Sequence, residues 1–187
     1  MKSKLLYVFI AMALFACKDD EGDKPVTPEI PNEEEVITTV RYTLTPSTGG
    51  TAKVFQFQDL DGDGGNAPII SGDTLDLNVT YTGSIEFLNE LESPADDITE
   101  EVLAEGDEHQ VFYQVTSGDF VITYTDQDSN GNPIGLTTTF ESKTMGGNLK
   151  VVLRHEPVKG AVGVSGGDIT NAGGETDIEV VFPVNVR

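Results

Sequence analysis

From residue 36 to the end of the chain, apolar and polar side chains alternate with a period of two in most of the segments between turns. In the stretch 75–81, for example, Leu75, Leu77 and Val79 alternate with polar residues. Successive side chains of a β-strand point to opposite faces, so this pattern is typical of strands with one buried face. We expect strands at residues 36–45, 51–58, 75–81, 85–88, 109–115, 120–125, 134–140, 149–155 and 178–186.

These segments predict an all-β fold, an Ig-like antiparallel β-sandwich, because they are short and are separated by turns rich in Gly, Asn, Asp and Pro. One stretch departs from the pattern. Cap-type residues at 93–97 precede two glutamates, which predicts one short helical segment over 98–105, and Gly106 weakens its far end. Pro183 cannot donate a hydrogen bond to a neighbouring strand, so we expect the last strand at a sheet edge.

The first residues predict export. Lys2 and Lys4 precede an apolar run at residues 5–15, which is too short to cross a bilayer because a spanning helix needs about 20 apolar residues. This arrangement is typical of a cleaved signal peptide, here residues 1–16. The string LFAC ending at Cys17 resembles a lipobox, in which the cysteine carries fatty acyl chains such as palmitate and becomes the first residue. The alternative is a plain signal peptide with a coincidental cysteine.

Residues 17–35 predict a flexible, disordered tether between the anchor and a single domain at 36–187. Prolines and like charges in this segment favour an extended, unpacked chain. The Lys-Asp-Asp string after Cys17 resembles the surface-export signal of Bacteroidetes lipoproteins. We therefore expect an outer-membrane lipoprotein at the cell surface. An ordinary linker that leaves the protein on the periplasmic face is the alternative.

The composition excludes several partners. The chain has 32 acidic and 11 basic residues and a formal net charge of −21, so it repels phosphate backbones and we expect no nucleic-acid binding. Because such a chain is not attracted to an anionic membrane by charge, the acyl chains must supply the membrane anchor. Cys17 is the only cysteine, so the domain has no internal disulfide and depends on its hydrophobic core.

Asp59, Asp61 and Asp63 resemble the start of a calcium-binding loop. Carboxylates at alternate positions bring oxygens to one side of a tight turn, as a hard cation such as Ca²⁺ requires. An EF-hand loop needs a glutamate where this chain has Ile70, and we expect no helices beside it. The alternative is that these aspartates close a turn through their own side chains.

Glu101, Glu105 and His109 are spaced four residues apart, so they share one side of a helix if that helix continues through Gly106. Carboxylate and imidazole together suit Zn²⁺ or another transition metal. His155, the only other histidine, would complete a site of two histidines and two carboxylates. The alternative is that the acids form a solvated face, and a helix that stops at Gly106 turns His109 away.

The string GVSGG at residues 163–167 matches the Gly-x-Ser-x-Gly motif of serine hydrolases, but that motif needs a strand before the serine and a helix after it. A glycine-rich loop follows Ser165 instead, so we expect no enzymatic activity. The string Asp-Thr-Leu around Thr74 fits a short O-glycosylation acceptor, and the start of a strand is the alternative.

The chain also resembles a group of small envelope lipoproteins from flavobacteria and other Bacteroidetes. The strings that carry the resemblance are FQDLDGDGGN (57–66), ESPADDITEE (92–101), EHQ (108–110), LRHEP (153–157) and GGETDIEV (173–180). Members are often labelled as type 1 periplasmic-binding-fold superfamily proteins. That label does not suit the strand pattern, because such a fold needs alternating helices and strands. The resemblance implies ligand capture at the envelope beside a TonB-dependent receptor.

We therefore expect a non-enzymatic envelope lipoprotein that binds a metal ion or a small cationic or metal-containing ligand, with an outer-membrane receptor as its partner. The expected ligands are His109, His155, Glu101 and Glu105. The alternative is an Ig-like structural or interaction module of the outer membrane, stabilised by calcium at the 59–63 loop.

Overall fold

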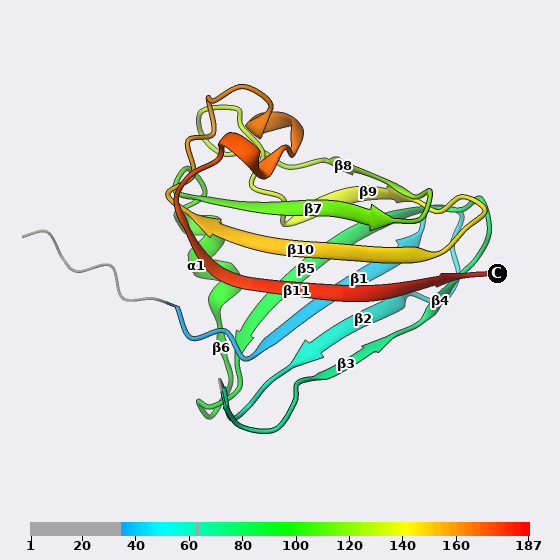
Figure 1. Cartoon of the computed structure of the whole chain (residues 1–187), viewed down its shortest axis with the longest axis horizontal. Coiled ribbons are helices and arrows are strands. Elements are labelled where there is room, and N and C mark those ends of the chain that lie inside the picture. Colours follow the sequence, from blue (N-terminus) through cyan, green and yellow to red (C-terminus); the bar gives the residue numbers. More distant parts are fainter. Residues whose placement is uncertain (1–34, 63) are drawn as a thin grey trace, which may run out of the picture. The chain divides into compact units, whose positions relative to one another are not determined.

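The computed structural model describes residues 35–62 and 64–187 (Figure 1). The predicted signal peptide at 1–16, the lipidation site Cys17 and all of the predicted tether except Glu35 lie outside the described residues, as does Asp63. The predictions about export and acylation therefore stay predictions.

Two β-sheets form the described part of the chain. The first has the order β3-β2-β1-β5-β9-β8, with β6 pairing to β5, and the second has the order β4-β11-β10-β7. The strands of the first sheet are β1 (Thr39–Pro46), β2 (Lys53–Gln58), β3 (Ile69–Gly72), β5 (Thr80–Asn89), β6 (Asp96–Asp97), β8 (Val121–Tyr124) and β9 (Thr137–Glu141). Those of the second are β4 (Thr74–Leu75), β7 (His109–Ser117), β10 (Gly147–His155) and β11 (Glu175–Val186). The predicted all-β sandwich with one short helix is confirmed.

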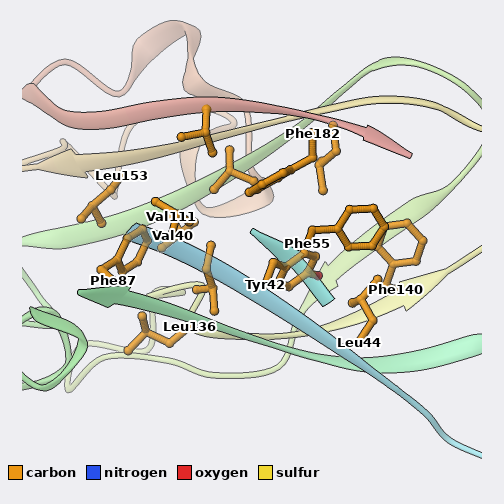
Figure 2. Packing of buried hydrophobic residues seen from close by; sticks show 14 of the residues in the cluster. Val40, Tyr42, Leu44, Phe55, Phe87, Val111, Leu136, Phe140, Leu153 and Phe182 are labelled. Carbon is orange, nitrogen blue, oxygen red and sulfur yellow. The ribbon is translucent and has the colours of Figure 1, made fainter. Parts of the chain in front are cut away.

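The core fills the space between the two sheets, as Figure 2 shows. The first sheet contributes Tyr42, Phe87 and Phe140, none of which is exposed, because alternate residues of each strand face inward. Phe55 on β2 meets Phe182 on β11 edge to face, with ring centroids 6.1 Å apart. Each such buried side chain contributes about 1.5–3 kcal/mol, so the apolar alternation that predicted the strands also holds the sheets together.

The stretch 75–81 is not one strand, so that prediction was wrong. Leu75 ends β4 in the second sheet, Tyr81 lies on β5 in the first, and both are buried. Between them Asn78 adopts a φ of 55°, the left-handed conformation of a tight turn, and Leu77 is exposed. The apolar alternation therefore spans a crossover between sheets. The sequence pattern also missed β3, whose residues are all exposed.

The predicted helix is α1 (Ile98–Ala104). The Asp97 carboxylate accepts a hydrogen bond from the Thr99 backbone N–H at 3.1 Å, which caps the first turn. The helix ends before Gly106, where an added Cβ would lie 2.6 Å from the Ile134 side chain. None of the helices within residues 35–62 and 64–187 is long and apolar enough to cross a membrane.

An excursion between β10 and β11 packs on the second sheet. It contains two 3-10 turns, η1 (Val164–Gly166) and η2 (Ile169–Asn171). Val164 and Ala172 form a second apolar cluster with Phe112 of β7 and Val152 of β10. The expectation that the last strand lies at an edge was wrong, because the two residues of β4 pair with Asn185 and Val186 on the far side of β11; Pro183 lies outside that short pairing.

Candidate metal centre

His109 and His155 lie side by side at one end of the second sheet. His109 begins β7, His155 ends β10, and the antiparallel register pairs them directly. Their rings stack with centroids 4.7 Å apart and planes 17° from parallel. Both are buried, and His109 is only 1 % exposed. The sequence left open whether the two histidines meet, and the pairing of β7 with β10 brings them together.

The surroundings of His109 prepare one ring nitrogen for a ligand. Its Nδ1 lies 3.3 Å from the backbone carbonyl oxygen of Glu105, and its Nε2 lies 3.3 Å from Oε1 of Glu35. This Nε2 is buried and has no hydrogen-bond partner in the described residues. In the neutral ring, an Nδ1–H donated to the Glu105 carbonyl leaves Nε2 with its lone pair, which is the form that binds metals.

A β-bulge in β11 places the third member of the site. Thr176 pairs with Arg154 of β10 and Ile178 pairs with Leu153, so Asp177 between them has no partner on β10. Such a bulge breaks the alternation of a strand and re-aims a side chain, often beside a functional site. The carboxylate of Asp177 thereby comes within reach of His109.

Glu35, His109 and Asp177 each offer one ligand atom, and the three atoms lie within 4.8 Å of one another. In each residue one polar atom is buried and lacks a hydrogen-bond partner: Oε2 of Glu35, Nε2 of His109 and Oδ2 of Asp177. Leaving such an atom unsatisfied costs about 1–3 kcal/mol, and more when it is charged. Three neighbouring residues that each hold such an atom match an imidazole-and-carboxylate site for a cation such as Zn²⁺.

The electrostatics of this end of the sandwich favour a cation. Burial, followed by the charge of the neighbouring Glu35 carboxylate, raises the pKa of Asp177 to about 6 against the opposing effect of the two histidines. Burial, followed by the Glu35 and Glu105 charges, also raises the pKa of Glu101. For His109 burial lowers the pKa, but the Glu35 carboxylate outweighs it and the net direction is upward. The negative charge of Glu35 contributes to all three upward shifts.

The four ligands expected from the sequence do not form one group. Glu101 and Glu105 gather with Glu35, whereas His155 gathers with the exposed Glu108 and Glu156 and its Nε2 lies 3.8 Å from a Glu108 carboxylate oxygen. The expected helical face was wrong, because α1 ends at Ala104 and His109 belongs to a strand. Glu105 instead reaches His109 through its backbone carbonyl.

Sequence reasoning missed Glu35 and Asp177. Glu35 is the last of three consecutive glutamates and was assigned to the tether, although it touches the domain. Asp177 was placed just outside the last strand. One feature of the sequence could have identified Asp177: it is an acidic residue beside the apolar alternation that begins at Ile178, a pattern that fits a bulge.

The expected calcium ligands Asp59 and Asp61 serve a turn. One oxygen of Asp59 accepts from the backbone N–H of Gly62 at 2.9 Å, and Oδ2 of Asp61 accepts from the N–H of Asn66 at 3.0 Å. These are the bonds by which aspartates close turns. Since Asp63 lies outside the described residues, the calcium site stays a prediction.

Comparison of the chain with protein-family models, curated proteins and solved structures gave no significant match. The assignment of function therefore depends on the geometry of this chain.

Proposed function

We propose that this protein is a non-enzymatic envelope lipoprotein that captures a divalent transition-metal ion of the Zn²⁺ type through Glu35, His109 and Asp177. Lipid-anchored at the outer membrane, it supplies its cargo to a TonB-dependent receptor. The observation that carries the proposal is that these three residues bring ligand atoms within 4.8 Å of one another and that each also holds a buried polar atom without a hydrogen-bond partner.

The donor set supports a cation of borderline softness. Two carboxylates and one neutral imidazole carry two negative charges, which a bound divalent ion neutralises, and all three groups are common zinc ligands. Three protein ligands leave a fourth tetrahedral position open, whereas structural zinc sites are closed by four. An open position suits capture and release. The net charge of −21 also raises the local concentration of cations around the domain.

The two histidines play different parts in this proposal. His109 supplies the metal ligand, and His155 holds the ring of His109 by stacking on it. Metal-binding histidines are commonly oriented by a partner at the other ring nitrogen, a part taken here by the Glu105 carbonyl. In this proposal Glu105 and His155 are therefore not ligands but orient the ligand His109.

Calorimetric titration of the purified acylated protein in detergent with Zn²⁺ tests the proposal, at about pH 7.5, which is about one unit above the ordinary pKa of imidazole. We expect one site, and a loss of more than about a hundredfold in affinity for His109→Ala and for Asp177→Ala. Glu179→Gln is the matched control, because Glu179 lies two residues along β11 and pairs with Lys150 instead. Equal heats from the parent and from the His109 and Asp177 variants, all folded by circular dichroism, would overturn the proposal.

A further inference from the structure

A pocket of about 440 Å³ opens beside the metal centre. The residues that follow Glu35, the loop after β2, Leu91 and the bulged start of β11 line it. These segments lie at the end of the sandwich where β1 and β11 begin (Figure 1). Phe57, Leu60 and Ile178 form apolar walls. This volume falls in the range of small-molecule sites, which are about 300–1,000 Å³ and mostly apolar.

Every charged side chain in the lining is acidic. Asp59, Asp61, Asp177 and Glu179 contribute carboxylates, and no lysine, arginine or histidine of the described residues lines the pocket. An anionic ligand is repelled by such a lining, and the chain around it is also strongly acidic. The lining therefore selects for positive charge.

The four carboxylates differ in how far they are already satisfied. Those of Asp59 and Asp61 accept backbone N–H groups of their own turn, and that of Glu179 lies 2.7 Å from the Lys150 ammonium. Asp177 keeps a buried oxygen with no hydrogen-bond partner. Of these four carboxylates, that of Asp177 is therefore the least satisfied by hydrogen bonds.

We propose that this pocket binds a small organic cation, an ammonium group carried on an apolar or aromatic body. The ammonium lies at Asp177, and the body packs against Phe57, Leu60 and Leu91. Burial of the body supplies affinity, while a charge-assisted hydrogen bond to a partly desolvated carboxylate supplies selectivity. The ring of Phe57 also favours a cation or an aromatic body. This site does not rest on metal capture, although Asp177 belongs to both.

A matched series of indoles tests the charge requirement: tryptamine, a cation, tryptophol, its neutral analogue, and indole-3-acetate, an anion. The acylated protein in detergent is titrated with each in the presence of EDTA, so no metal takes part. We expect tryptamine to bind at least about tenfold more tightly than tryptophol, a difference of about 1.4 kcal/mol. Indole-3-acetate should not bind. Equal affinity for tryptamine and tryptophol, or no saturable binding of tryptamine, would overturn the proposal.

Two exposed leucines locate the site. Leu91 lines the pocket and is 59 % exposed, while Leu103 on α1 is 60 % exposed and lies outside the lining, so a lysine fits at either without entering the core. Leu91→Lys should weaken tryptamine binding at least about tenfold through charge repulsion and leave Zn²⁺ affinity within about twofold. Leu103→Lys should change neither. Unaltered tryptamine binding by Leu91→Lys would refute the pocket as the site. If the protein bound tryptamine but not Zn²⁺, the proposed metal capture would be overturned and the organic-cation site would stand.

Discussion

The imidazole of His155 lies flat against that of His109, at a centroid distance of 4.7 Å, and the two come from neighbouring strands that pair them directly. A buried ring held by such a stack has little freedom to rotate. Because Nδ1 of His109 also faces the Glu105 carbonyl, the ring keeps Nε2 directed at Glu35. One histidine thus fixes the orientation in which the other presents its lone pair.

Substitution of His155 separates support from ligation. His155→Phe keeps a flat ring against His109, so we expect Zn²⁺ affinity within about threefold of the parent, whereas His155→Ala should weaken binding about tenfold, as removal of a supporting group does. His109→Phe should abolish binding. Calorimetry on the three variants measures this order. If His155→Phe lost as much affinity as His109→Phe, His155 would be a ligand itself.

Asp177→Asn should stabilise the metal-free domain at neutral pH. The folded-state pKa of Asp177 is raised from 3.8 to about 6 by burial and by Glu35, so the charged carboxylate is disfavoured in the fold. An asparagine removes the charge, and its N–H₂ can donate to Glu35. Because the carboxylate is partly exposed and water screens part of the shift, we expect a gain of about 1–2 kcal/mol above pH 6.

The pH dependence of this difference in stability follows from proton binding. Below pH 3.8 the carboxyl is protonated in both states, and as pH rises to about 6 the unfolded chain releases its proton first, so the parent loses stability relative to the variant. Urea unfolding at several pH values measures the difference. Excess Zn²⁺ should reverse the ranking, because only the parent retains the ligand. A variant less stable than the metal-free parent at neutral pH would contradict this.

The strands were predictable because their periodicity records burial directly. Val40, Tyr42 and Leu44 alternate on β1 and are all fully buried. Alternation does not record which sheet a strand joins, which is why residues 75–81 were misread. The turn at Asn78 that divides them depends on a single left-handed residue.

The metal centre was only partly predictable, since its parts are distant in the sequence. The sequence singled out His109 and His155 as the scarce imidazoles of an acidic chain, but spacing pointed to a helical face that α1 does not provide. Asp177 reaches the site through a bulge, and Glu35 through the path of the chain into β1. Neither feature has a periodic signature.

Lys159 and Asp128 form a buried ion pair, and removal of one partner should lower the free energy of unfolding. Their side chains are 4 % and 1 % exposed, and Nζ of Lys159 donates to Asp128 at 3.0 Å and to the Pro133 carbonyl at 3.1 Å. Lys159→Met leaves a buried carboxylate without its cation, which costs about 3–5 kcal/mol. The exposed pair Lys150–Glu179 is the control, and Lys150→Met should cost less than about 1 kcal/mol.

Acid unfolding gives a second measure of that pair. Burial alone raises the pKa of Asp128, but Lys159 and the N–H groups of Asn132 and Asn130 outweigh it and the pKa falls below 3.8. A carboxyl with a lowered folded-state pKa stabilises the fold at pH values above its unfolded-state pKa, and that contribution is lost as pH falls below 3.8.

Adding Asp128→Asn to Lys159→Met should recover part of the stability lost in Lys159→Met, because Asn keeps the turn acceptor without the charge. No recovery would show that the ion pair is not what Lys159 contributes.

Cys17→Ser tests the anchor on which the envelope assignment depends. A lipobox cysteine is acylated and becomes residue one, and the hydrophobic chains hold the protein at the membrane, whereas the net charge of −21 gives no electrostatic attraction to anionic lipid. We expect palmitate labelling of the parent in its native host and none of the variant. Fractionation should move the variant from the outer membrane to the soluble envelope fraction, while its Zn²⁺ affinity stays unchanged because Cys17 is not a ligand. If the parent were unlabelled and mass spectrometry showed an N-terminal residue other than Cys17, the lipobox prediction would be wrong and the alternative, a plain signal peptide, would hold.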